Sequence, residues 1–229
     1  MSILLNVEDL KAWYGQSQVL FGVDMFVHEG QVVSLMGRNG MGKSTTISSI
    51  CGMMARIEGK VTFDNIALIG MQSYKIARSG IGLVPEGRRA FPNLTVLENL
   101  TAAANQGPWS LRRVYAMFPR LEERAAQSAA TLSGGEQQML VIGRALMTNP
   151  KLLILDEATE GLAPVIRQEI WAAVHKLKSE GMSILIVDKT LKDLLAVADN
   201  CFVLERGQTV WTGTPNAMTP EVADQYLGV

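Results

Sequence analysis

Residues 37–44 read Gly-Arg-Asn-Gly-Met-Gly-Lys-Ser and match G-x-x-x-x-G-K-S/T, a motif that binds the phosphates of a nucleoside triphosphate. The motif functions only between a β-strand and an α-helix. The apolar residues 31–36 predict a short buried strand, and residues 44–54 predict a helix with Gly52 at its fraying end. This segment therefore constrains the chain to an α/β fold organised around a phosphate site.

Strands are predicted on the N-terminal side of this loop. Residues 3–10 and 19–27 alternate partly between apolar and polar side chains, and Tyr14-Gly15 is read as the turn between them. A further β-rich piece covers residues 59–63, and residues 82–85 resemble another strand end.

The second half of the chain alternates strands with helices. The predicted order is strand 152–155, helix 165–179, strand 183–187, helix 191–198 and two short strands around 206–207. Such alternation predicts a mainly parallel sheet with right-handed crossovers. Thr219 is predicted to cap a short last helix, with Pro220 in the tolerated first position.

Residues 94–127 are Ala-rich and helical in pattern, with Pro108 and Pro119 as breaks. We interpret this stretch as a helical subdomain inserted into an α/β core. The predicted organisation is one domain over residues 1–229, in which 1–93 and 128–229 form the core and its β subdomain.

Length and charge limit the class of protein. A chain of 229 residues suffices for one large domain or one domain with a subdomain, and a net charge of −1 gives no electrostatic reason to expect nucleic-acid binding. The N-terminal residues lack a basic region and a long apolar core, so no signal peptide is expected, and no apolar run approaches the ~20 residues of a membrane span. Cys51 and Cys201 are expected to be buried thiols rather than a disulfide or metal site.

The phosphate loop supplies the first candidate site residues. Its glycines allow backbone N–H groups to close around a triphosphate, Lys43 is expected to reach the β- and γ-phosphates, and the Ser44 hydroxyl is expected to bind Mg²⁺. The helix that follows directs its positive dipole end at the same anion. The nucleotide-binding residues expected here are Gly37, Arg38, Asn39, Gly40, Met41, Gly42, Lys43, Ser44 and Thr45.

Two carboxylates follow the apolar run 152–155. Asp156 ends this predicted strand, where a lone carboxylate is costly unless it faces a cation, so Mg²⁺ is its expected partner. Glu157 follows it directly. Elsewhere, residues 132–136 read Leu-Ser-Gly-Gly-Glu before a helix predicted to begin near Gln137; read alone, they describe a helix start capped by Ser133.

The phosphate loop, the Ser-Gly-Gly-Glu segment and the Asp-Glu pair occur in an order that resembles the ATP-binding cassette (ABC) ATPases. The resemblance implies a P-loop NTPase core with an N-terminal antiparallel β subdomain and an inserted α-helical subdomain, and ATP and Mg²⁺ as cofactors. It implies that Glu157 is the general base and that Tyr14 stacks on adenine. It further implies that four residues contact the γ-phosphate held by an opposite subunit: Ser133, Gly134, Gly135 and Glu136.

A narrower resemblance is to the F-type ATPase subunit of branched-chain amino acid importers. It is carried by residues 85–91 (Pro-Glu-Gly-Arg-Arg-Ala-Phe) and 161–164 (Gly-Leu-Ala-Pro), with further matches at 94–100, 118–121, 134–140 and 143–146. Glu86 occupies the position where most cassettes have a glutamine that senses Mg²⁺. The implied partners are a G-type ATPase subunit or a second copy of this chain, two membrane permeases and, indirectly, a periplasmic binding protein.

Departures from the family pattern affect the catalytic region. The switch histidine of the family is expected after the strand 183–187, where this chain has Lys189, unusual even within the F-type branch. Lys189 can be a catalytic residue that offers its charge to the phosphate, or a solvated loop residue, and both readings stay open. Glu160 is atypical, and Ala163 stands where many cassettes have Asp.

The resulting expectation is a Mg²⁺-dependent ATPase subunit, peripheral on the cytoplasmic face of the inner membrane, that powers import of branched-chain amino acids or related small polar substrates. One alternative is a cassette protein acting on nucleic acid or in translation; the expected partners include no nucleic acid. The other alternative is a catalytically weak nucleotide-binding subunit, suggested by Lys189. Intact Lys43, Ser44, Asp156 and Glu157 favour catalysis.

Overall fold

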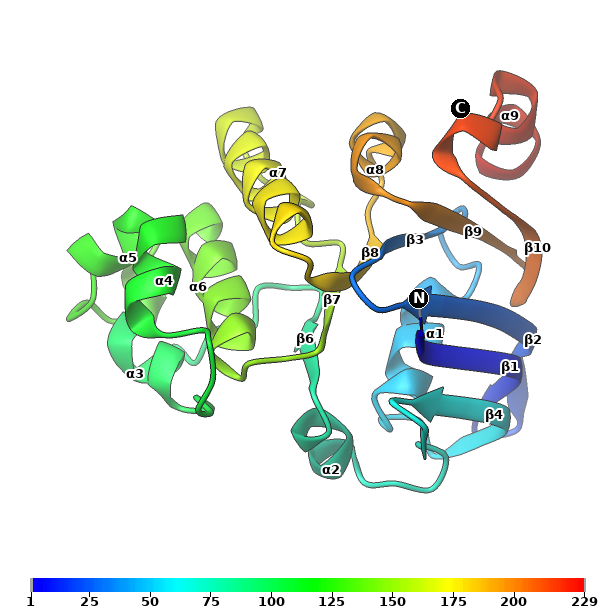
Figure 1. Ribbon diagram of the computed structural model, residues 1–229, viewed down its shortest axis with the longest axis horizontal. Coiled ribbons are helices and arrows are strands. Elements are labelled where there is room, and N and C mark those ends of the chain that lie inside the picture. The colour runs from blue at the N-terminus through cyan, green and yellow to red at the C-terminus, as the bar shows by residue number, and fades with distance from the viewer. Residues whose placement is uncertain (1, 229) are drawn as a thin grey trace.

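The computed structural model describes residues 2–228 and contains one ten-stranded sheet (Figure 1). Antiparallel strands form one end of the sheet, in the order β5 (Ile66–Ala67), β4 (Arg56–Phe63), β1 (Ile3–Tyr14) and β2 (Ser17–His28). The sheet continues through β10 (Gln208–Gly213), β9 (Asn200–Glu205), β3 (Val32–Met36), β8 (Ser183–Val187), β7 (Leu152–Asp156) and β6 (Ile81–Val84). The strands from β9 to β6 are parallel, which confirms the expected α/β architecture.

All but one of the helices lie between these strands in the chain, and the last of them lies after the final strand. In order they are α1 (Lys43–Ile50), α2 (Ser73–Arg78), α3 (Val96–Thr101), α4 (Leu111–Met117), α5 (Pro119–Glu123), α6 (Gly134–Met147), α7 (Pro164–Ser179), α8 (Leu191–Val197) and α9 (Pro220–Leu227). Short 3-10 turns cover Ala129–Thr131 and Pro215–Ala217. In the part of the chain that is described, no helix is long and apolar enough to cross a bilayer.

The central parallel strands separate two hydrophobic cores. Successive side chains of a strand point to opposite faces of the sheet. In β7, Leu153 and Leu155 join the core beneath α6, α7 and α8, whereas Leu152 and Ile154 join the core shared with α1 and the antiparallel strands. In each of the strands β3, β7 and β8, all five residues are buried. These strands are therefore covered on both faces, and their residues are apolar except for Ser34, Asp156 and Ser183.

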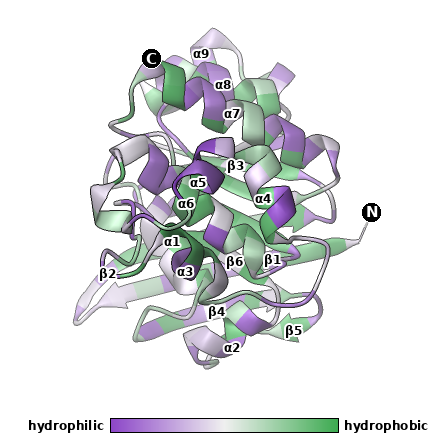
Figure 2. Cartoon of the chain, turned by 90° about the vertical axis from the view of Figure 1, so that its left-hand side faces the viewer, coloured by the Kyte–Doolittle hydropathy of each residue, from purple (hydrophilic) through white to green (hydrophobic). Residues whose placement is uncertain are grey.

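Helices α3, α4 and α5 contact α6 and form a helical group at one end of the molecule (Figures 1 and 2). Gly143 allows this approach, because a Cβ there would lie 2.8 Å from Val114 Cγ1. The predicted insert at 94–127 supplies α3, α4 and α5, whereas α6 follows it in sequence and is the helix on which they pack. The domain boundaries themselves stay a prediction.

Several predicted element bounds need correction. The strands predicted at 3–10 and 19–27 extend over Ile3–Tyr14 and Ser17–His28, because cross-strand pairing continues into the tight turn. The helix predicted over 44–54 ends at Ile50, before Gly52, whose φ of 65° is left-handed. The helix expected near Gln137 begins at Gly134.

Candidate nucleotide-binding and hydrolysis site

The phosphate loop joins the buried strand β3 to α1. Lys43 is the first residue of α1, and its side chain is buried, with 7% exposed. Its Nζ donates hydrogen bonds to the carbonyl oxygens of Gly37, at 2.7 Å, and Arg38, at 3.0 Å. Burial lowers the pKa of Lys43, although Glu157 and Asp156 oppose that shift. The ammonium is therefore held across the loop by two backbone carbonyl groups.

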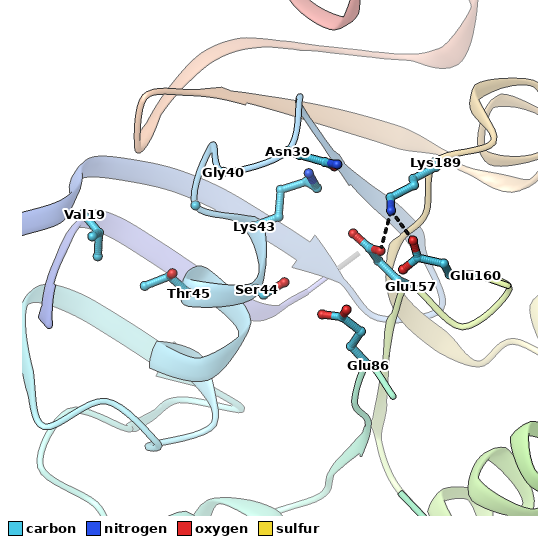
Figure 3. A pocket seen from close by; sticks show the side chains of 11 residues that line it. Val19, Asn39, Gly40, Lys43, Ser44, Thr45, Glu86, Glu157, Glu160 and Lys189 are labelled. Atoms are coloured by element: carbon cyan, nitrogen blue, oxygen red, sulfur yellow. Dashed lines mark hydrogen bonds and ion pairs between the residues drawn. The ribbon is translucent and has the colours of Figure 1, made fainter. Parts of the chain in front are cut away.

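A pocket of about 340 Å³ lies in front of this loop (Figure 3). It gathers residues that are far apart in the sequence, from the phosphate loop, β2 and the loops after β6, β7 and β8. The lining residues are Val19, Asn39, Gly40, Gly42, Lys43, Ser44, Thr45, Glu86, Glu157, Glu160 and Lys189. The three residues predicted to act in catalysis, Lys43, Glu157 and Lys189, are thus brought together. Val19 and Glu160 were not predicted as site residues; only the atypical identity of Glu160 gave a signal.

Three oxygen groups next to the phosphate loop suit a divalent cation. Asp156 ends β7 with 6% of its surface exposed, and the Ser44 hydroxyl lies 3.5 Å from its Oδ1 as a donor. Burial raises the pKa of Asp156, while the Ser44 hydroxyl and the charge of Lys43 act in the opposite direction. Glu86 lines the same pocket after β6. Hydroxyl and carboxylate oxygens are ligands that Mg²⁺ prefers, so Ser44, Asp156 and Glu86 fit this ion.

Glu157 follows Asp156 in a left-handed conformation, with φ of 50°. Its N–H donates to the carbonyl oxygen of Val187 in β8, at 2.9 Å, which anchors the backbone to the sheet. The side chain is 11% exposed. Burial and the neighbouring Glu160 raise the pKa of Glu157 to about 7, against the opposing effect of Lys189. A carboxylate with this pKa is suited to accept a proton near neutral pH.

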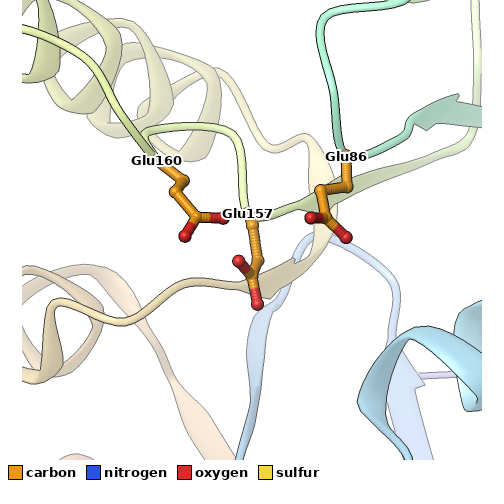
Figure 4. Close-up of side chains that lie close together, drawn as sticks. All are labelled: Glu86, Glu157 and Glu160. Atoms are coloured by element: carbon orange, nitrogen blue, oxygen red, sulfur yellow. The ribbon is translucent and has the colours of Figure 1, made fainter. Parts of the chain in front are cut away.

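Lys189 lies beside Glu157 in the loop between β8 and α8. Its Nζ is 3.3 Å from Glu157 Oε2 and also donates a short hydrogen bond to Glu160 Oε1. The carboxylates of Glu86, Glu157 and Glu160 have oxygens within 4.8 Å of one another (Figure 4). The ammonium thus lies among these acids, and the pKa of Lys189 is raised chiefly by Glu160.

The Ser-Gly-Gly-Glu segment forms the start of α6. The Ser133 side chain accepts a hydrogen bond from the Glu136 N–H, and Glu136 Oε2 accepts from the Ser133 N–H at 2.8 Å, which is a reciprocal capping box. Glu136 Oε1 also pairs with Arg124 Nε at 2.7 Å. The carboxylate of Glu136 therefore points into its own chain. None of these residues lines the pocket in front of the phosphate loop.

Three other predicted nucleotide-binding residues lie at the edge of the site or turn away from it. Tyr14 ends β1 with 57% of its surface exposed and does not line the pocket, whereas Val19 of β2 does. Arg38 is directed toward α9, with Nη2 3.5 Å from the carbonyl oxygen of Asp224. The Met41 sulfur accepts a hydrogen bond from the N–H of Arg206.

Comparisons with known proteins indicate the same family as the sequence motifs. The model of the ABC transporter family matches residues 20–160. The chain is 42% identical to the high-affinity branched-chain amino acid transport ATP-binding protein BraG of Pseudomonas aeruginosa, over 98% of this chain and 100% of that protein. It is 31% identical to the probable branched-chain amino acid transport ATP-binding protein LivF of Archaeoglobus fulgidus, over 94% of each. Among solved structures, the ADP conformation of an ATP-binding cassette of an ABC transporter matches with a TM-score of 0.84 at 28% identity, over 100% of each chain.

Proposed function

The chain belongs to the ABC transporter family of ATP-binding cassettes, and from this premise we propose that it energises an importer for branched-chain amino acids or related small polar substrates. Members of this family bind nucleotide and couple ATP hydrolysis to transport. The full-length similarity to two proteins named for branched-chain amino acid transport supports this substrate class.

The observation that carries the catalytic part is the pocket that holds Lys43 opposite Glu157 and Lys189 (Figure 3). Lys43 supplies the charge that binds the β- and γ-phosphates, together with the N–H groups of the loop. Glu157 orients a water molecule for in-line attack and accepts its proton. Ser44, Asp156 and Glu86 would hold Mg²⁺, which supplies neutralising charge at the phosphate oxygens.

The nucleotide base and the second subunit complete the proposed site. Tyr14, exposed at the end of β1, would stack on adenine at the open side of the pocket. The start of α6 presents the N–H groups of Gly134 and Gly135, and these would contact the γ-phosphate of an ATP held by the opposite chain. The working unit would then be a dimer with a G-type ATPase subunit or with a second copy of this chain.

The proposed complex contains this dimer, two membrane permeases and, indirectly, a periplasmic binding protein. The chain would lie peripherally on the cytoplasmic face of the inner membrane. ATP binding would close the dimer, hydrolysis would reopen it, and the permeases would convert the closure into alternating access to the substrate.

Reconstitution tests this proposal. Proteoliposomes that contain the permeases and both ATPase subunits should take up radiolabelled leucine when Mg-ATP is inside and the binding protein outside. Lys43→Ala should abolish uptake and tight ATP binding in titration calorimetry, because the triphosphate loses its main countercharge; Lys176→Ala, at an exposed position on α7, is the matched control. Hydrolysis stimulated by DNA or RNA but not by the permeases would favour the nucleic-acid alternative.

A further inference from the structure

Two residues that depart from the family pattern, Glu160 and Lys189, form an ion pair although 29 residues separate them. Glu160 lies in the loop after β7, and Lys189 lies in the loop after β8. These two strands are parallel neighbours, so their carboxyl ends open at the same edge of the sheet. Each departure is unexplained by itself, but together the two residues supply a carboxylate and an ammonium whose opposite charges compensate each other.

The backbone on both sides of this pair is held in place. Thr159 Oγ1 donates to Asp188 Oδ2 at 2.6 Å, which ties the two loops together one residue before each partner. Arg88 Nη2 donates to the carbonyl oxygens of Glu160, at 3.2 Å, and Gly161, at 2.9 Å. The direction in which the Glu160 side chain leaves the loop is therefore determined by contacts outside the ion pair.

The Lys189 side chain has no comparable support of its own. It is 48% exposed, and its four-carbon stem loses rotamer freedom when its ammonium is held in one place. A second cation, Lys43, lines the same pocket and opposes its presence there. Among the described residues, its ion-pair partners are Glu157 and Glu160. When the charge of Glu160 is removed, the 3.3 Å contact with Glu157 is the remaining ion pair among the described residues that holds the ammonium. It must then outweigh both the hydration of the ammonium and its repulsion by Lys43.

We propose that Glu160 is a positioning residue that acts through Lys189: it holds the ammonium of Lys189 beside Glu157 at the mouth of the phosphate pocket. The proposal rests on the ATP hydrolysis assigned to this pocket. Lys189 then contributes positive charge where the transferred phosphoryl group gains negative charge. The carboxylate of Glu160 pairs with Lys189 and also lies beside Glu157, so its effect through Lys189 has to be separated from its direct effect on Glu157.

A double-mutant cycle in the assembled complex tests the coupling. Glu160→Gln should lower kcat by roughly 3- to 10-fold, within the range measured for pairs of residues in contact, and leave KM for Mg-ATP nearly unchanged. Lys189→Ala should lower kcat at least as much, and adding Glu160→Gln to it should cause a much smaller loss than Glu160→Gln causes in the wild type, because only the direct effect of Glu160 on Glu157 then remains. Glu58→Gln, an exposed partner of Arg56 on β4, is the matched control. Equal loss with and without Lys189, or no loss from Glu160→Gln, overturns the proposal.

A measurement that does not depend on turnover separates this proposal from the proposed function. Acetylation of Lys189 by acetic anhydride, followed by mass spectrometry of the nucleotide-free chain, should be slow in the wild type, faster in Glu160→Gln and again slow in Glu160→Asp. Unchanged labelling in Glu160→Gln overturns the positioning role even if the complex hydrolyses ATP. A complex that hydrolyses no ATP but shows the expected labelling contradicts the proposed function and leaves the ion pair established.

Discussion

The carboxylate of Glu157 lies in a left-handed turn at the end of a buried strand, between a lysine and a second carboxylate. Its backbone N–H is anchored to β8, so the main chain from which the side chain projects is tied to the edge of the sheet. Burial and Glu160 raise its pKa to about 7. The residue next to Asp156, the proposed ligand of the cation, is thereby kept able to exchange a proton.

Glu157→Gln should preserve ATP binding and slow hydrolysis by a factor on the order of 10²–10⁴, because the amide cannot accept a proton but has nearly the same shape. Single-turnover hydrolysis of radiolabelled ATP measures the rate, and calorimetry measures the affinity. Glu58→Gln should change neither. A wild-type single-turnover rate in Glu157→Gln would place the general base at another residue.

Tyr14→Ala should raise the KM for ATP modestly and leave kcat nearly intact, because stacking on adenine stabilises the ground state and the transition state alike. An aromatic stacking contact contributes about 0.5–1.5 kcal/mol, so the rise should be roughly 2- to 12-fold. Tyr14→Phe should retain the wild-type KM. Steady-state kinetics that show a large fall in kcat at unchanged KM would identify Tyr14 as a structural residue instead.

The phosphate loop passes close to β9, and this approach depends on a residue without a side chain at Gly37. Gly37 has φ of 142°, and a Cβ there would lie 2.4 Å from the carbonyl oxygen of Leu204 in β9. Gly40, in the same loop, has φ of 78°, and nothing lies within 4 Å of its position for a Cβ. The two glycines therefore share a backbone requirement, but only Gly37 is pressed against the neighbouring strand.

This contrast predicts different stabilities for two alanine variants. Gly40→Ala should cost about 1–3 kcal/mol of unfolding free energy, the strain of a positive φ for a residue with a side chain. Gly37→Ala should cost more, because the backbone of β9 must also move. Urea unfolding followed by circular dichroism gives both values. Equal urea midpoints and equal unfolding free energies for the two variants would mean that the backbone of β9 at Leu204 moves without a cost in free energy.

The molecule as a whole consists of two cores on opposite faces of one sheet, and each core contains one thiol. Cys201 belongs to the core beneath α6, α7 and α8, and Cys51 belongs to the core with α1 and the antiparallel strands. Burial raises the pKa of Cys51 to about 12 and also raises the pKa of Cys201. Strands β3, β7 and β8 contribute side chains to both cores, so opening one core disrupts the other.

Both thiols should therefore resist Ellman's reagent at pH 8 in the native protein and become reactive together as urea unfolds the chain. Met53→Cys, at a position 52% exposed, should react at once and serves as the positive control. Reaction of Cys201 well before Cys51, resolved by peptide mapping, would show that the two cores open separately.

The sequence by itself determined the features that depend on local chemistry. The glycine pattern of the phosphate loop, the carboxylates after an apolar strand and the cap at Ser133 each follow from residue types a few positions apart. The parallel sheet follows equally from the alternation of buried strands and amphipathic helices. Helix ends were predicted less accurately: α6 begins at Gly134, directly after its cap, rather than near Gln137, and α1 ends at Ile50, before the left-handed Gly52.

Only the tertiary structure decided which distant residues meet. The adjacency of β7 and β8 brings Glu160 to Lys189, and the position of β2 places Val19 beside the phosphate loop. The packing of α3, α4 and α5 on α6 likewise depends on Gly143, which no periodicity marks as a contact. Strand order and side-chain direction are global properties of the sheet, because they are set by the burial of both faces at once rather than by any single segment.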